Sequence, residues 1–182
     1  IRISWQEYLQ QTINFNKMLS VMETMRIEID GEYSGIKFSA SHFIPGHSKC
    51  GRLHGHSYIL HLVLCGEKGN NGMIMDFVDL KKCLRDIVSE LDHRILLPKN
   101  SPELSINVGS EIEVKTCTKR YVFPLEDVML LDISQTSAEE MAEMILNMLL
   151  SKIDFPSNVE YAEIGLDEER GQTAWAGRRL HQ

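Results

Sequence analysis

The stretch Cys50-Gly51-Arg52-Leu53-His54-Gly55-His56-Ser57-Tyr58 decides how this chain folds, because it places a thiol and two imidazoles within seven residues. In an extended strand, successive side chains point to opposite faces, so His54 and His56 project from one face and can bind one ion. A helix would separate them. The pattern predicts a strand over residues 53–64, and its even positions share the face of the two histidines.

A third ligand must come from another segment, and His42 is the candidate. The even positions Ile36, Phe38, Ala40 and His42 fall on one face of a preceding strand-like segment, which turns His42 inward. Three histidines leave a tetrahedral zinc ion with one open position, which is typical of a catalytic site.

The histidine pattern has a plainer interpretation as well. An isolated pair two residues apart is only moderately specific for a metal, and two strand histidines can be satisfied by backbone hydrogen bonds. His47 lies in the intervening loop and His61 has the opposite parity, so we interpret both as structural.

Cys50 has three possible roles: a fourth zinc ligand, a small buried apolar residue or a catalytic thiol. A nearby zinc ion, together with Lys49 and Arg52, would favour the thiolate, which is the form that exchanges protons or attacks a substrate.

Two carboxylate positions complete the candidate site. Asp92 and His93 follow a predicted helix, either as a C-terminal cap or as a carboxylate that orients a proton-shuttling imidazole. In the acidic run Asp167-Glu168-Glu169, parity counted from Leu166 directs Glu168 inward. A buried carboxylate there could accept paired N–H donors from a heterocycle such as guanine or pterin, with Asp167 as the competing choice.

Composition narrows the class of protein. A chain of 182 residues with 43% hydrophobic content fits one domain over residues 1–182. The net charge of −7 argues against nucleic acid as a partner. The four cysteines form no paired motif, and no apolar run is long enough to span a membrane, so we expect reduced thiols and a cytoplasmic protein.

The order of expected elements is of the α+β class. We expect an N-terminal helical extension (residues 1–24), two strands, a helix whose apolar positions run from Phe77 to Leu91 and which ends near Asp92-His93-Arg94, and an inserted hairpin within residues 99–132. A second helix opens at Ser137 with Glu140 completing a capping box, and a last strand covers residues 161–166.

Taken together, these residues resemble the family of 6-pyruvoyl tetrahydropterin synthase and 6-carboxytetrahydropterin synthase, over about residues 25–98 and 133–177. The similar pieces are Phe38-Ser39-Ala40-Ser41-His42-Phe43, the stretch from Cys50 to Tyr58, Gly72-Met73-Ile74-Met75-Asp76-Phe77, Leu91-Asp92-His93 and Thr136-Ser137-Ala138-Glu139.

The resemblance implies a fold and a set of roles. The fold is the tunnelling fold, an antiparallel sheet with two helices on one face, and the subunits join into a homo-oligomer, usually a hexamer built as a dimer of trimers. The implied zinc ligands are His42, His54 and His56, the implied catalytic residues are Cys50, Asp92 and His93, and the implied substrate-binding residues are Glu168 and Thr136. The family usually has threonine after the pterin-binding glutamate, whereas Glu169 follows here.

The three residues between Cys50 and His54 look like the carboxytetrahydropterin branch. That branch implies a zinc-dependent lyase that converts 7,8-dihydroneopterin triphosphate to 6-carboxy-5,6,7,8-tetrahydropterin, releasing triphosphate and acetaldehyde, in queuosine or archaeosine precursor biosynthesis. The alternatives are a 6-pyruvoyl tetrahydropterin synthase, which eliminates triphosphate without cleaving the side chain, and a non-catalytic zinc- or pterin-binding protein. The triphosphate would need a local basic patch, for which the candidates are Lys37, Lys49, Arg52 and Arg94.

Overall fold

The computed structural model describes residues 25–181, so the helix expected within residues 1–24 lies outside the described residues. The elements, in chain order, are β1 (Met25–Ile29), α2 (Gly31–Ser34), β2 (Lys37–His42), β3 (His54–Gly66), α3 (Phe77–Leu91), β4 (Arg94–Pro98), β5 (Ser105–Val108), β6 (Glu111–Lys115), β7 (Arg120–Pro124), η1 (Leu125–Asp127), β8 (Val128–Leu131), α4 (Ala138–Lys152), β9 (Val159–Glu169) and β10 (Gln172–Arg179).

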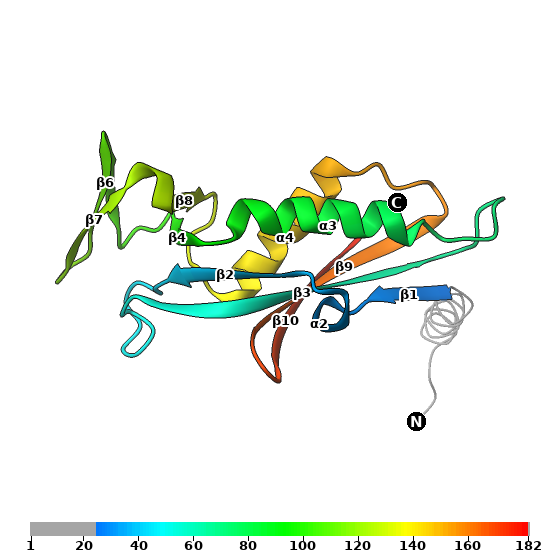
Figure 1. The fold of residues 1–182 in the computed structure, drawn as a ribbon, viewed down its shortest axis with the longest axis horizontal. Helices are drawn as coiled ribbons and strands as arrows, with labels where there is room; N and C mark the ends of the chain where they lie inside the picture. Colours follow the sequence, from blue (N-terminus) through cyan, green and yellow to red (C-terminus); the bar gives the residue numbers. More distant parts are fainter. Residues whose placement is uncertain (1–24, 182) are drawn as a thin grey trace, which may run out of the picture.

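The long strand β3 is the axis of the main sheet (Figure 1). One edge of β3 pairs with β9, while the other edge pairs first with β2 and then with β1, all antiparallel. The order across the sheet is β10-β9-β3-β2-β4-β8, with β1 beside β3. The short helix α2 fills the step between β1 and β2, and Gly31 there lies so close to Leu60 that an added Cβ would meet the Leu60 carbonyl oxygen.

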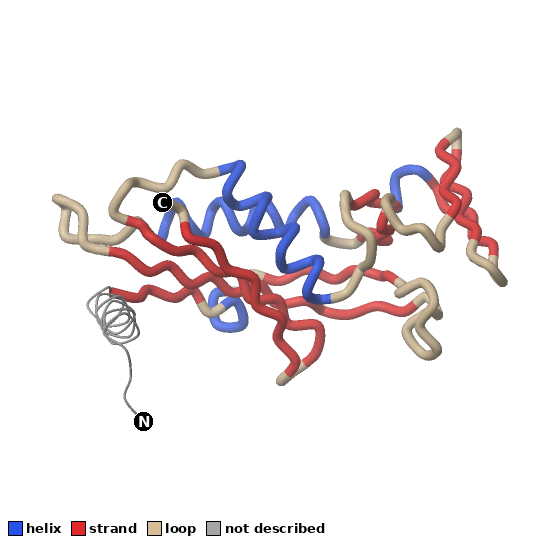
Figure 2. Tube along the Cα trace, turned by 180° about the vertical axis from the view of Figure 1, so that it is seen from behind, coloured by secondary structure: helices blue, strands red, loops and turns tan. Residues whose placement is uncertain are grey.

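Helices α3 and α4 lie side by side across one face of this sheet (Figures 1 and 2). The even positions of β3 that were predicted to face inward are buried between the sheet and these helices, as are the inward positions of β2. Phe77 is an exception to the predicted helical stripe, because the residue is 43% exposed at the first turn of α3. The opposite face carries no long helix within residues 25–181.

The inserted segment differs from the single hairpin predicted over residues 99–132. The hairpin exists as β6 and β7, but β5 adds a third strand to it, and β8 leaves the insertion to join the main sheet. β8 pairs in parallel with β4, which pairs in parallel with β2, so this side of the otherwise antiparallel sheet is parallel. The last strand is also longer than predicted, and β10 follows it as a hairpin partner.

Helix α4 begins where the sequence predicted, but its cap is only half of a capping box. The Ser137 hydroxyl oxygen accepts a hydrogen bond from the Glu140 N–H at 3.4 Å. The Glu140 carboxylate does not return to Ser137; it accepts from the backbone N–H groups of Ser134 and Gln135 at 2.8 and 3.1 Å. No helix within the described residues is both long and apolar enough to cross a membrane.

We expect Ser137→Ala to lower the free energy of unfolding by about 1 kcal/mol, because an orphan N–H of the first turn loses its acceptor. Urea unfolding followed by circular dichroism measures this. Ser89→Ala, at an exposed position on α3, is the control and should change stability little; an equal loss in both variants would contradict the capping role.

Candidate active site

The structure brings the three histidines of the predicted metal site together. His42 ends β2 and His54 begins β3, and the two are direct partners in the antiparallel ladder. His56 follows on the same face of β3. The ring centroids of His42 lie 4.6 Å from those of His54 and 5.2 Å from those of His56, and one ring nitrogen from each histidine lies within 4.8 Å of the other two.

Backbone carbonyl groups set the tautomers of two of these rings. The Nδ1 atom of His42 lies 2.9 Å from the carbonyl oxygen of Thr136, and that of His54 lies 2.7 Å from the carbonyl oxygen of Arg52. A carbonyl oxygen only accepts, so both Nδ1 atoms carry the proton and both Nε2 atoms present a lone pair. This is the orientation in which histidines ligate a metal.

The free nitrogens of the site are buried without partners. Neither His42 Nε2 nor His56 Nε2 has a hydrogen-bond partner, although both are shielded from solvent. Burial, and then the neighbouring His54, lowers the pKa of His42 to about 4, so its neutral, metal-binding form prevails at neutral pH. The Nε2 lone pairs of His42 and His54, with one ring nitrogen of His56 close to both, fit a zinc ion with one position left open for another ligand.

Glu168, at the end of β9, lies directly against this cluster. Its Oε1 atom is 3.3 Å from His42 Nε2 and 3.7 Å from His56 Nε2. Because His42 Nε2 offers a lone pair, this approach of a carboxylate is favourable only when a cation or a proton lies between them. The buried Tyr58 hydroxyl is also near, and burial together with the charge of Glu168 raises the pKa of Tyr58.

Asp167 points the other way. Its Oδ2 atom lies 3.3 Å from His61 Nε2, and its Oδ1 atom accepts a hydrogen bond from the Thr173 hydroxyl at 2.6 Å. The Nδ1 atom of His61 accepts the Gly31 N–H at 3.2 Å. Glu168 therefore faces the histidine cluster, and Asp167 faces His61. Substrate binding by Glu168 stays a prediction.

Cys50 lies half-buried in the loop that joins β2 to β3. Its N–H donates to His47 Nδ1 at 2.9 Å, and its carbonyl oxygen accepts the Ile44 N–H at 2.8 Å. These hydrogen bonds make a compact turn, and the His47 side chain stabilises it from within the loop. The Cys50 thiol does not belong to the group of ligand atoms that the three histidines form.

Asp92 and His93 form the predicted carboxylate–imidazole pair between α3 and β4. Asp92 Oδ2 lies 2.8 Å from His93 Nδ1, while Asp92 Oδ1 accepts the Ser39 N–H at 2.8 Å. The hydrogen bond from Ser39 is the main reason that the pKa of Asp92 is lowered. The His93 N–H donates to the Ser39 carbonyl oxygen, and His93 has a φ of 56°, the left-handed region that non-glycine residues rarely adopt.

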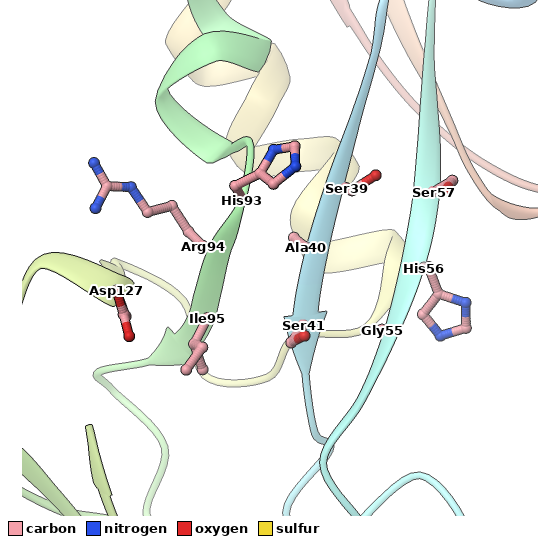
Figure 3. A pocket seen from close by; sticks show the side chains of 10 residues that line it. All are labelled: Ser39, Ala40, Ser41, Gly55, His56, Ser57, His93, Arg94, Ile95 and Asp127. Atoms are coloured by element: carbon pink, nitrogen blue, oxygen red, sulfur yellow. The ribbon is translucent and has the colours of Figure 1, made fainter. Parts of the chain in front are cut away.

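The pair opens onto a groove of about 590 Å³. In Figure 3, His93 lies on one side of β2, and Ser39, Ser41 and Ser57 lie along β2 and β3. The ring of His56 points away from β2 on the far side of β3. His93 is 83% exposed at its side chain, so its ring is open to a ligand. Because side chains alternate along β2 and β3, the serines that line this groove lie on the sheet face opposite to that of the histidine cluster.

Thr136 is fully buried, and its hydroxyl donates to the Phe43 carbonyl oxygen at 3.0 Å. Its own carbonyl oxygen accepts from His42 Nδ1, so the contact seen is with His42 rather than with the groove. Direct substrate binding by Thr136 stays a prediction. Two features were missed from the sequence: the carbonyl of Arg52 that orients His54, and the buried hydroxyl of Tyr58. Tyr58 shares the even face of His54 and His56, so parity could have found it.

Comparisons with known proteins agree with this arrangement. The family model described as 6-pyruvoyl tetrahydropterin synthase matches residues 33–179. A Methanocaldococcus jannaschii protein named "Putative 6-carboxy-5,6,7,8-tetrahydropterin synthase" is 37% identical over 155 residues, covering 82% of this chain and 94% of that protein. A Rickettsia felis protein named 6-carboxy-5,6,7,8-tetrahydropterin synthase is 29% identical over 136 residues, covering 73% and 89%.

Solved structures match as well. The crystal structure of 6-pyruvoyl tetrahydropterin synthase from Plasmodium vivax superposes with a TM-score of 0.81 at 30% identity, covering 87% of this chain and 99% of that one. The sheet, its two helices and the histidine cluster at the ends of β2 and β3 define a tunnelling-fold protein, as the sequence predicted. The chain belongs to the 6-pyruvoyl tetrahydropterin synthase family.

If the three histidines hold zinc, His54→Ala should lose most of the bound metal, because two remaining ligands cannot close a tetrahedral site. Metal content after dialysis against a weak chelator, measured by mass spectrometry, tests this. His61→Ala, on the same strand but the opposite face, is the control and should retain zinc; equal losses would show that the metal lies elsewhere.

The backbone of His93 allows a test that separates function from folding. We expect His93→Gly to be more stable than His93→Ala by about 1 kcal/mol, because only glycine adopts a positive φ without steric cost. Both variants should lose turnover to a similar extent. Thermal unfolding and steady-state rates measure the two effects, and equal stabilities would mean that the φ of 56° carries no strain.

Proposed function

We propose that this chain is a zinc-dependent lyase that converts 7,8-dihydroneopterin triphosphate to 6-carboxy-5,6,7,8-tetrahydropterin, releasing triphosphate and acetaldehyde, in the synthesis of queuosine or archaeosine precursors. Family membership supports the general class, a lyase-type pterin synthase. The specific 6-carboxy product is supported by the match to the Methanocaldococcus jannaschii protein over most of both chains. The spacing of Cys50 and His54 agrees with it.

The metal ligands in this proposal are His42, His54 and His56. Bound zinc would act as a Lewis acid toward the side-chain hydroxyls of the substrate. Glu168 would bind the N–H groups of the pterin ring from the same face of the sheet, since a carboxylate accepts two parallel N–H donors well. The cavity beside it, about 380 Å³, is lined by His56 and Glu168 among others.

Proton transfer in this proposal belongs to Cys50 and to the pair Asp92 and His93. Cys50 would exchange a proton with the substrate side chain. Asp92 already holds the His93 ring at 2.8 Å, which leaves His93 Nε2 free to donate or accept the complementary proton. We further propose a cytoplasmic homo-oligomer, a hexamer built as a dimer of trimers, with Thr136 near the substrate.

A second candidate is triphosphate elimination that stops at the 6-pyruvoyl product. It is favoured by the Plasmodium vivax structure, which covers 87% of this chain and is named for that activity. The two reactions share the zinc ligands and the proton relay and differ in whether a carbon–carbon bond is broken.

Product analysis distinguishes these candidates. Zinc-loaded protein incubated with dihydroneopterin triphosphate should yield acetaldehyde and a 6-carboxy pterin, both identified by mass spectrometry. A 6-pyruvoyl pterin would move the assignment to the second candidate. An intact substrate, with zinc bound, would point to a binding protein and refute both enzymatic functions.

We expect Cys50→Ala to keep its zinc and to lose turnover by about 100-fold or more, because a positioned acid or base is removed. Metal analysis and steady-state kinetics are measured on the same preparation. Cys65→Ala provides the matched control with unchanged rates, and loss of zinc from Cys50→Ala would instead identify Cys50 as a ligand.

A further inference from the structure

Residues 43–53 form the loop that carries Cys50, and we call it the Cys50 loop. The inserted sheet of β5, β6 and β7 contacts both ends of this loop. At its start, the buried Phe43 packs against Tyr121 of β7, with ring centroids 5.3 Å apart. At its end, Lys119, in the turn between β6 and β7, donates from Nζ to the Gly51 carbonyl oxygen at 2.5 Å. Figures 1 and 2 show the insertion and this loop at the same end of the molecule.

A cavity of about 650 Å³ lies between the Cys50 loop and the insertion. Its lining includes Arg52 and His47 from the loop and Lys119 from the insertion, with Glu103 as its one carboxylate. Within the described residues, neither Arg52 nor Lys119 forms an ion pair. In a protein of net charge −7, a cavity lined by two cations without ion-pair partners and by one carboxylate is a place where an anion is favoured.

Hydrogen bonds among the residues that line this cavity position its hydrogen-bond donors. The Thr116 side-chain oxygen accepts the N–H groups of Thr118 and Lys119 at 3.2 and 2.9 Å, which shapes the turn that presents Lys119. Lys119 uses one ammonium hydrogen on Gly51 and keeps two for a ligand. His47 accepts at Nδ1 from Cys50, so its Nε2 atom carries a proton and also donates.

The other basic candidates have less favourable surroundings. The cavity that contains Lys37 and Arg170 is also lined by Glu32, Glu168 and Glu169, so three carboxylates face two cations there. Arg94 shares its groove with Asp127. Arg52 differs from both, because its carbonyl oxygen orients His54 while the residue also lines the basic cavity. It therefore connects the histidine cluster with an anion-favouring space.

We propose that this cavity binds the phosphate chain of the substrate, with Arg52 and Lys119 as its two cationic contacts. The inference rests on the proposed function, since only a phosphorylated substrate would use the site. Because Lys119 belongs to the insertion, the proposal gives the insertion two roles. It completes the phosphate site, and it holds the Cys50 loop in place beside that site. Arginine supplies a planar pair of donors for phosphate, and lysine a point charge.

Inorganic triphosphate is the probe for this site. Calorimetric titration of the zinc-loaded full chain at fixed ionic strength should show binding that is about tenfold weaker in Arg52→Gln and in Lys119→Gln. Lys115→Gln is the matched control, because Lys115 lies on the same insertion but pairs with Glu113 outside the cavity. Unchanged binding in both test variants, or equal weakening in the control, would overturn the proposal.

A second measurement separates this site from the proposed function. Neopterin triphosphate should bind the protein more tightly than neopterin, and Arg52→Gln should remove most of that difference while leaving neopterin affinity unchanged. Arg52 suits this test because its side chain makes no hydrogen bond or ion pair within residues 25–181. If the pterins bind normally but Arg52 and Lys119 have no effect, the phosphate site is wrong; if triphosphate alone binds, the proposed function is wrong.

Discussion

The antiparallel register between β2 and β3 is the constraint on which the site depends. It sets His42 opposite His54 and Phe38 opposite Tyr58. Because side chains alternate along a strand, a slip of one residue would turn the histidines out of the site and the apolar residues out of the core together. The packing of Tyr58 and its even-numbered neighbours under α3 and α4 therefore also fixes the geometry of the histidine cluster.

The remaining parts of the site attach to the same two strands. Asp92 and His93 bind the backbone of Ser39 on β2 through an N–H and a carbonyl group. Thr136, just before α4, orients His42, and the Cys50 loop joins the two strands directly. These contacts use backbone groups whose positions the sheet already determines. The helix end before β4 and the loop before α4 are thereby tied to β2 through backbone groups.

Much of the site was predictable because it is local and periodic. Alternation identified the inward faces of β2 and β3, and it distinguished Glu168, which lies against His42 and His56, from Asp167, which lies against His61. The helices α3 and α4 followed from apolar spacing and capping residues. Phe77 was the wrong detail: it lies at the first residue of α3, and within residues 25–181 it is left 43% exposed.

The sequence by itself determined the two long strands, the two helices and the residues that face one another across β2 and β3, because these depend on the period of side chains along one element. Only the tertiary structure decided the parallel pairing of β4 and β8, the third strand of the insertion, and the contact between Lys119 and Gly51. Those pairings join segments far apart in the chain, and strands of four or five residues are too short to carry a period that identifies their partners.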